Sequence, residues 1–146
     1  MDYQALAPGK KVVPGGFGNP AAEVVFVGES PTPAELVKGT ANQAVLKVLR
    51  DVFPDSFDLD NFLYINAVPY LIPKVKDKKK NTEASQRAAV NCHDYINHEI
   101  SKHPRRIVVC LGNVAMWAVT GDLSTKITQI RGQLFGYANA QCGILA

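Results

Sequence analysis

The stretch Val25-Phe26-Val27-Gly28-Glu29-Ser30-Pro31 decides the fold of this 146-residue chain. It starts as a continuous apolar run and ends in a glycine followed by a carboxylate. Apolar runs of this length that are rich in Val are typical of strands buried on both faces of a parallel sheet. Pro20 precedes the run, and Pro31 and Pro33 stiffen the segment after it. We therefore predict a strand over residues 23–27 and a rigid loop after it.

Two further apolar runs, residues 62–66 and 106–111, have the same character and predict two more strands. Between the first and second runs, residues 41–52 carry apolar side chains spaced by three and four, which predicts a helix. Residues 82–103 show the same spacing between the second and third runs. The pattern therefore alternates strand and helix along the chain.

Capping residues mark the expected ends of these helices. Thr82 can serve as the N-cap of the long second helix, and Pro104 is expected to end it. A third helix is predicted after Gly112, and it should stop at Gly121. The apolar end that begins at Gly143 predicts the start of a further strand.

The order of these elements favours an α/β protein with right-handed crossovers. We expect a three-layer α/β/α sandwich with a central, mainly parallel four-stranded sheet. Residues 1–146 are long enough for one domain with a substantial core. We expect this single domain to be truncated before its last strand and helix, since the chain stops as a strand begins.

The composition is that of a folded protein, with 47% hydrophobic and 20% charged residues. The net charge of +3 permits a polyanionic partner without demanding one. No secretory signal and no run of roughly 18 apolar residues are visible, so we expect a cytoplasmic protein without a membrane span. The three cysteines stand at long spacings without a CxxC pair, so neither a disulfide framework nor a zinc site is predicted.

Ligands in open α/β sheets bind beyond the carboxyl ends of the strands. Glu29 is the most informative residue there, because a carboxylate held on a rigid strand end can activate a water or stabilise a cationic sugar-like transition state. The same residue could equally be a helix N-cap or a surface acid. Ser30 comes next in the chain and is expected to take part in recognition of a base in the same site.

Asn66 ends the second strand, where a core residue would be expected. Its amide offers a donor and an acceptor side by side, which can read the edge of a flipped pyrimidine. A turn-forming Asn is the alternative. Tyr70 lies four residues further on and could either stack on a base or pack in the core.

Phosphate contacts are predicted at two places. Gly112 and Asn113 open a helix directly after a strand, so their free amides can hold a phosphate or form only a tight turn. The run from Lys74 to Lys80 has five lysines against one aspartate, and it is either a solvated loop or a phosphate-contacting one through Lys76, Lys78, Lys79 and Lys80.

Several site types lack support in the sequence. His93, His98 and His103 are spaced by five, so they do not share a helix face and predict surface residues and no metal site. No GxGxxG comes after the first strand and no GxxxxGK[ST] occurs, so neither dinucleotide nor P-loop binding is predicted.

Taken in order along nearly the whole chain, these motifs resemble family 4 uracil-DNA glycosylases of bacteria and archaea and their phage relatives, including glycosylase-like domains attached to phage DNA polymerases. The similar segments are Val12-Val13-Pro14-Gly15 through Asn19-Pro20-Ala21-Ala22, Val27-Gly28-Glu29-Ser30-Pro31, Ile65-Asn66-Ala67-Val68, Val108-Val109-Cys110-Leu111-Gly112-Asn113-Val114-Ala115 and Ile130-Arg131-Gly132-Gln133.

The resemblance implies a hydrolase that acts in base excision repair of DNA. Glu29 would be the motif carboxylate, and Asn66 would bond the Watson–Crick edge of a base flipped from single- or double-stranded DNA. Arg131, in the segment that is similar to the family's Arg-Gly turn, would contact DNA. The product of hydrolysis at the N-glycosidic bond of uracil would be an abasic site, and no cofactor takes part in that chemistry.

The chain also departs from the family pattern. The family holds an iron–sulfur cluster on four cysteines, of which only Cys92 has a counterpart, so the cluster is not expected. Residues 36–38 lack the family's base-stacking Phe, and its His-Pro-Ser motif would come after Ala146. We therefore expect weak or no activity from this chain alone, with a larger polypeptide or replication protein supplying the missing segment.

Two alternatives stay open. The chain could be a non-catalytic DNA- or protein-binding relative, for example part of a phage replication protein. It could also be an unrelated nucleotide- or phosphate-binding α/β domain.

Overall fold

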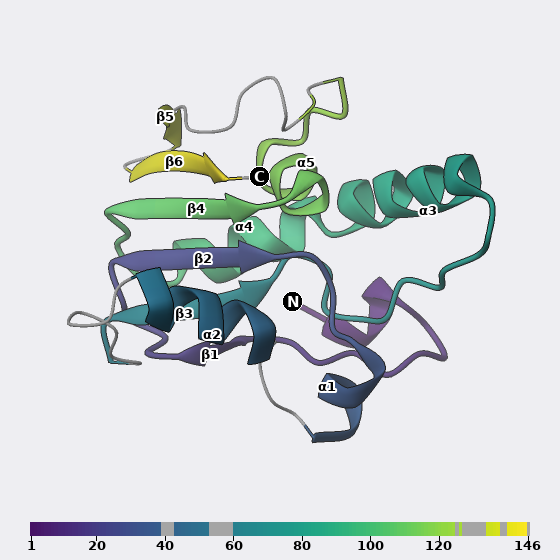
Figure 1. Ribbon diagram of the computed structural model, residues 1–146, viewed down its shortest axis with the longest axis horizontal. Helices are drawn as coiled ribbons and strands as arrows, with labels where there is room; N and C mark the ends of the chain where they lie inside the picture. The colour runs from purple at the N-terminus through teal and green to yellow at the C-terminus, as the bar shows by residue number, and fades with distance from the viewer. Residues whose placement is uncertain (39–42, 53–59, 125, 127–133, 138–139, 146) are drawn as a thin grey trace.

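The protein forms a single six-stranded sheet in the order β1-β3-β2-β4-β6-β5 among the residues that the computed structural model describes, which are 1–38, 43–52, 60–124, 126, 134–137 and 140–145. Four central strands pair in parallel, namely β3 (Phe62–Asn66), β2 (Val24–Gly28), β4 (Ile107–Leu111) and β6 (Ala140–Leu145). In Figure 1 the arrows of β2, β4 and β6 point the same way. The expected α/β/α class with four parallel strands is confirmed.

Two antiparallel edge strands, which the sequence did not predict, complete the sheet. They are β1 (Gly16–Gly18), paired with β3, and β5 (Leu134–Tyr137), paired with β6. β1 has glycine at two of its three positions, so no apolar run announces it. The backbone of β1 lies so close to β3 that Gly16 has no room for a side chain, because a Cβ there would lie 2.5 Å from the carbonyl oxygen of Tyr64.

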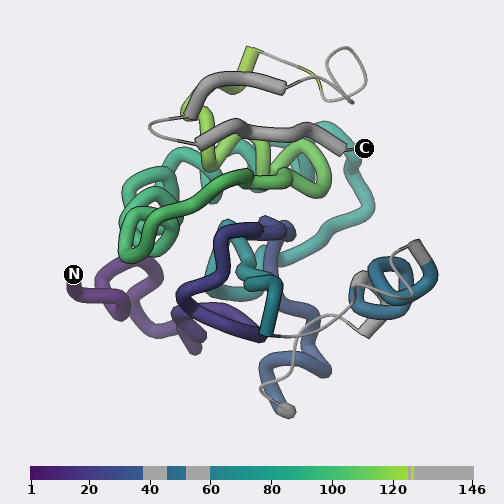
Figure 2. Tube along the Cα trace, turned by 90° about the vertical axis from the view of Figure 1, so that its left-hand side faces the viewer, coloured from purple at the N-terminus to yellow at the C-terminus, as the bar shows by residue number. Residues whose placement is uncertain are grey.

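Both faces of the sheet are covered by helices because the central strands are apolar on both sides. Val25 and Val27 face a core shared with α3 (Lys78–Asn91), α4 (His93–Ser101) and α5 (Asn113–Thr120). Phe26 points to the opposite face and packs with Leu46 and Leu49 of α2 (Gln43–Val52). Figure 2 shows α2 standing apart from the other long helices. Successive side chains of β2 point alternately into the two apolar cores, so the sheet forms the middle of three layers.

The predicted helix after Gly112 is confirmed as α5, with glycine at both ends. Gly112 precedes it at a φ of 102°, and Gly121 comes after it at a φ of 74°. The Gly121 amide closes the last turn by donating to the carbonyl of Trp117 at 2.8 Å. Only glycine adopts such positive φ values without strain, so these two residues set where the helix begins and ends.

The single helix predicted over residues 82–103 is wrong. Two helices replace it, because the chain breaks at Cys92 between α3 and α4. Just before the break, the Asn91 side chain donates to the carbonyl of Leu6 at 2.7 Å and to the hydroxyl of Tyr70 at 3.0 Å. These are bonds to residues far away in the sequence, so the helical period alone could not reveal the break.

The predicted ends of that helix also differ. Asp77, and not Thr82, caps α3, because its carboxylate accepts from the amides of Lys79 and Lys80 at 2.9 and 3.3 Å. Thr82 instead donates its hydroxyl to the carbonyl of Lys78. At the other end, α4 stops at Ser101, before the proline that was expected to end it.

An N-terminal clasp of four side chains, Tyr3, Tyr70, Asn91 and Tyr95, holds the first residues of the chain to the domain. Tyr3 lies in the short 3-10 helix Tyr3–Leu6 and meets the Tyr95 ring edge to face, with centroids 5.8 Å apart. The Tyr95 hydroxyl accepts from the amide of Gly15 at 3.0 Å. Tyr95 is fully buried, and that burial raises the pKa of its hydroxyl.

The three histidines do not all lie on the surface as predicted. His98 is exposed, but His93 is half-buried, and its Nδ1 lies 2.6 Å from the carbonyl oxygen of Ala118. Among the described helices, none has the length and apolar character needed to cross a membrane.

Candidate active site

The ends of β2 and β3 are held together beyond the strands themselves. Gly28 is the register partner of Asn66. The Ala67 amide then donates to the carbonyl of Gly28, and the Val68 amide to that of Glu29, both at 2.9 Å. This continued ladder fixes the backbone of Glu29 next to Asn66, so two of the predicted site residues are neighbours.

Gly112 brings the end of β4 to the same place. A Cβ at Gly112 would lie 3.3 Å from Oε1 of Glu29, so the carboxylate lies over the glycine backbone. Gly28 is more crowded still, because a Cβ there would lie 1.9 Å from the hydroxyl oxygen of Tyr64 and 3.1 Å from Oδ1 of Asn66. Two glycines thus allow Glu29, Asn66 and the start of α5 to converge.

Tyr64 belongs to this group, although it was not among the predicted site residues. Its hydroxyl donates to Oδ1 of Asn66 at 3.3 Å. Burial raises the pKa of Tyr64 well above its ordinary value, and the negative charges of Glu35 and Glu29 raise it further. Tyr64 therefore stays protonated and remains a donor. The sequence could have predicted this contact, because Tyr64 stands two residues before Asn66 and residues i and i+2 of a strand share a face.

A strand-end cavity of about 510 Å³ opens beside Glu29. Its walls come from the loop after β2 and from residues 71–74, with Tyr64 and Leu111 completing the lining. Ser30 lines it as expected, while the exposed Glu29 contributes a carboxylate. A cavity of this volume accommodates a nucleotide-sized ligand.

The loop between Ser30 and α1 (Pro33–Lys38) is fixed by a reciprocal pair of side chains. The Glu35 amide donates to Oγ1 of Thr32 at 3.2 Å, and the Thr32 amide donates to Oε1 of Glu35 at 3.4 Å. This capping box satisfies donors at the start of the helix. Glu35 is buried, so the wall of the strand-end cavity is anchored from inside.

Tyr70 does not join Glu29 and Asn66. It is buried in the N-terminal clasp, where its hydroxyl accepts from Asn91 and lies in hydrogen-bond contact with the Cys92 thiol. Burial raises the pKa of Tyr70 to about 12. Its place among the predicted base-binding residues is therefore not supported by its position, and of the two predicted roles it has the packing one.

The predicted phosphate-contacting residues divide into three groups. Gly112 and Asn113 lie where β4 passes into α5, and Gly112 is next to the Glu29 carboxylate. Lys76, Lys78, Lys79 and Lys80 are all exposed, but the last three form the first turn of α3 and are not in a loop. Arg131 lies outside the described residues.

The residues present do not fit the iron–sulfur cluster of family 4. Cys92 is fully buried, and burial raises the pKa of its thiol to about 11, whereas cluster ligation needs a thiolate. The Tyr70 hydroxyl occupies the space beside it. Within the described part of the chain, no three His, Cys, Asp or Glu side chains gather where they could hold a metal ion.

Fold and strand-end geometry together define an α/β protein with a ligand crevice at the carboxyl ends of its parallel strands. Residues 15–145 match the model of the uracil DNA glycosylase superfamily. The chain belongs to this superfamily. It is 28% identical over 124 residues to the Type-4 uracil-DNA glycosylase of Archaeoglobus fulgidus, a match that covers 82% of this chain and 60% of that relative. The chain thus spans less than two thirds of the relative's length.

Proposed function

We propose that this domain binds a uracil flipped from DNA in the strand-end cavity and hydrolyses its N-glycosidic bond. One observation carries the proposal: Glu29, Asn66 and Gly112 converge at the ends of three adjacent strands. The family membership and the relative that is named a uracil-DNA glycosylase support the same chemistry.

Glu29 is the proposed catalytic carboxylate. It accepts a proton from a water, whose oxygen then attacks C1′ of the deoxyribose as the bond from C1′ to the base breaks. The bonding pair leaves on the base, and the carboxylate's charge stabilises the cationic sugar on the way. The exposure of Glu29 to the cavity suits this role, because the attacking water must reach it.

Asn66 is the proposed base-reading residue. Its Oδ1 accepts from Tyr64, which orients the amide and leaves Nδ2 to donate to a carbonyl oxygen of the base. Oδ1 keeps a second lone pair for an N–H of the base. Uracil presents a carbonyl oxygen beside an N–H, so the pairing is complementary.

The basic surface near the cavity supports a DNA partner and a second candidate function. Lys74 lines the cavity, and the exposed Lys76, Lys78, Lys79 and Lys80 come after it. Such charges bind phosphates without reading sequence. A non-catalytic relative that only binds DNA, for example within a phage replication protein, would use the same surface without Glu29.

The test uses the chain with single- and double-stranded oligonucleotides that carry one uracil. Abasic sites are revealed as strand breaks after alkali treatment, and binding is measured by fluorescence anisotropy. Glu29→Gln should lower the excision rate by about 10²-fold or more with little effect on DNA binding. Glu23→Gln is the matched control, because Glu23 is exposed and precedes β2 at the opposite end of the sheet.

Three outcomes decide between the candidates. Excision by the wild type and by Glu23→Gln, with loss in Glu29→Gln, supports the glycosylase. Binding of uracil-containing DNA without excision in any variant supports the non-catalytic relative. Equal excision by Glu29→Gln and wild type would show that the role assigned to Glu29 is wrong.

A further inference from the structure

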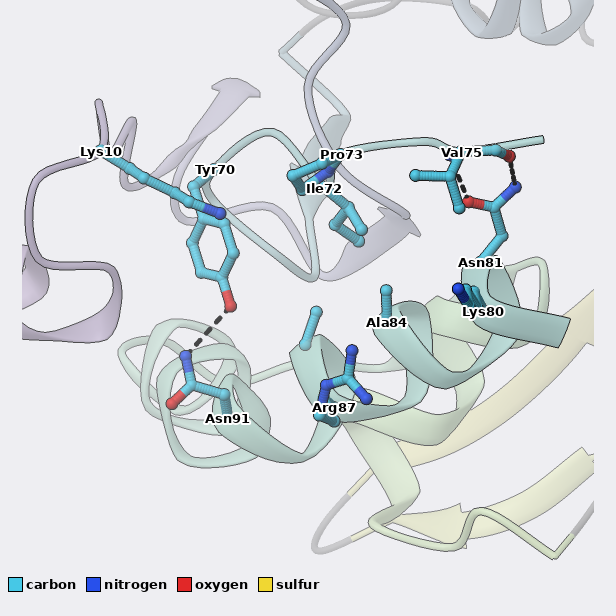
Figure 3. Close-up of a pocket in the computed structure, with 11 residues that line it drawn as sticks. Lys10, Tyr70, Ile72, Pro73, Val75, Lys80, Asn81, Ala84, Arg87 and Asn91 are labelled. Carbon is cyan, nitrogen blue, oxygen red and sulfur yellow. Dashed lines mark hydrogen bonds between the residues drawn. The ribbon is translucent and has the colours of Figure 1, made fainter. Parts of the chain in front are cut away.

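A second pocket, of about 520 Å³, lies beside the strand-end cavity and is not used by the proposed chemistry (Figure 3). Three segments that are far apart in the sequence form it: the chain at Lys10, residues 70–75 and one face of α3. Ile72, Pro73 and Val75 make an apolar wall opposite Ala84 and Ala88 of α3. We call it the basic pocket.

Its charged groups are all positive. Lys10, Lys80 and Arg87 line it, and no Asp or Glu is among its lining residues. Within the described residues, no salt bridge to a carboxylate neutralises any of these three cations, and the ion pair of Lys102 with Glu99 lies elsewhere. In Figure 3 the Lys10 side chain reaches across the Tyr70 ring, and Arg87 points toward Ile72. Their charges therefore add at the pocket's mouth.

The neutral polar groups of the basic pocket are already occupied. The Asn81 side chain bonds both the amide and the carbonyl of Val75, and the Asn91 amide group donates to Leu6 and to Tyr70. These bonds also hold the walls in place. The cations are thus the lining groups with free hydrogen-bonding capacity, and the ligand they suit is an anion with an apolar neighbour, as a sugar–phosphate is.

The basic pocket and the strand-end cavity share a wall. Ile72 and Pro73 line both of them. The pocket lies on one side of the chain segment 71–74, and the cavity lies on the other. A DNA strand with one nucleotide in the cavity reaches the basic pocket when it leaves the cavity over this wall. Resting on the proposed function, we propose that the basic pocket binds a phosphodiester of that same strand, flanking the flipped nucleotide.

The first experiment measures the salt dependence of binding to a single-stranded oligonucleotide without uracil. Arg87→Gln and Lys10→Gln should each weaken binding several-fold and reduce the slope of log K against log salt by roughly 0.7, the value for one phosphate contact with a single strand. Arg106→Gln is the control, because Arg106 is exposed and lies just before β4, at the opposite end of the sheet from the cavity. It should leave the slope unchanged.

The second experiment locates the phosphate relative to the base. One phosphodiester of a uracil-containing oligonucleotide is replaced by a neutral methylphosphonate at each position in turn. At one or two positions next to the uracil, the replacement should weaken binding to the wild type but not to Arg87→Gln, because both changes remove the same contact. Equal losses in both proteins at every position would overturn the proposal.

The two proposals fail in distinguishable ways. If no uracil is excised but Arg87→Gln still lowers the salt slope, the pocket holds DNA and the glycosylase proposal fails. If excision proceeds while Arg87→Gln binds DNA like Arg106→Gln, the pocket proposal fails alone. A third outcome is that inorganic phosphate shifts the Arg87 side-chain NMR signal while Arg87→Gln binds DNA as tightly as the wild type. That outcome overturns the choice of DNA as the source of the anion.

Discussion

The strand-end cavity and the basic pocket lie on two sides of the same short segment, residues 71–74, yet they arise differently. Beside the cavity, the backbones of Glu29 and Asn66 are held by a ladder that continues two parallel strands. The basic pocket depends on side chains that join distant segments, such as Asn91 with Leu6, 85 positions apart. Backbone hydrogen bonds between neighbouring strands build the first region, whereas side-chain contacts between distant segments build the second.

This difference predicts different responses to mutation. Side chains at the strand ends project from a frame that does not need them, so their loss should change chemistry and leave stability nearly intact. Side chains of the N-terminal clasp are part of the frame, so their loss should weaken folding. Substitutions in the two regions, together with a change of pH, test that contrast, from the largest expected effect to the smallest.

Tyr95→Ala should lower the free energy of unfolding by about 3–5 kcal/mol, the usual range for truncating a fully buried aromatic ring. It also removes the edge-to-face contact with Tyr3 and the acceptor for the Gly15 amide. Urea denaturation measures the loss. His98→Ala, an exposed change on the same helix, should be close to neutral. A loss below about 1 kcal/mol for Tyr95→Ala would contradict the structural role of the clasp.

Alkaline pH should weaken folding through the clasp. The pKa of Tyr70 is about 12 in the folded protein against 10.0 for an ordinary tyrosine, so the folded state holds this proton more tightly than the unfolded state. Its stabilisation is full below pH 10 and is lost as the pH rises toward 12. Urea midpoints at pH 9, 10 and 11 should fall less steeply for Tyr70→Phe. Parallel curves for the two proteins would show that Tyr70 does not contribute.

Tyr64→Phe should weaken recognition of the base and have only a small effect on the fold. It removes the donor that orients Asn66, a bond of roughly 1 kcal/mol, so binding of free uracil as a competitor should weaken about fivefold. Binding of a product oligonucleotide with an abasic site should not change, because that site has no base to read. The thermal midpoint should fall by only about 2–4 °C, the shift that a loss of roughly 1 kcal/mol gives in a chain of this size. Equal weakening with both ligands would mean that Tyr64 is not a positioning residue for Asn66.

Asn91→Ala should have a small effect on stability, about 0.5–1.5 kcal/mol, because two hydrogen bonds are lost at an exposed residue. Uracil binding should be unaffected, since Asn91 lines the basic pocket and not the strand-end cavity. Asn61→Ala, at an exposed asparagine before β3, is the control. A destabilisation no larger than that of the control would remove Asn91 from the clasp.

The residues that sequence patterns located correctly share one property: their position depends on local rules. Apolar runs predicted β2, β3 and β4 nearly to the residue, and glycines marked both ends of α5. Because parallel strands end at the same edge, their order also placed Glu29, Asn66 and Gly112 together. Tyr64 was missed because it was counted only as part of the apolar run 62–66.

The errors have the opposite origin. Tyr70 was predicted at the base site, and α3 and α4 were predicted as one helix ended by Pro104. Both depend on the contacts of Asn91 with Leu6 and Tyr70 and of Cys92 with Tyr70. No local sequence pattern predicts these contacts. The first-turn lysines of α3 were misplaced because Asp77, and not Thr82, caps the helix.

By itself, the sequence determined the strands β2, β3 and β4 and the convergence of Glu29 with Asn66, because apolar period, glycine and strand direction act over a few residues. Its motifs also resembled those of the superfamily to which the chain belongs. Only the tertiary structure decided that Tyr70 fills the place beside Cys92 and that Lys10, Lys80 and Arg87 surround one pocket. These groups come from distant segments, and their meeting depends on the packing of the whole chain.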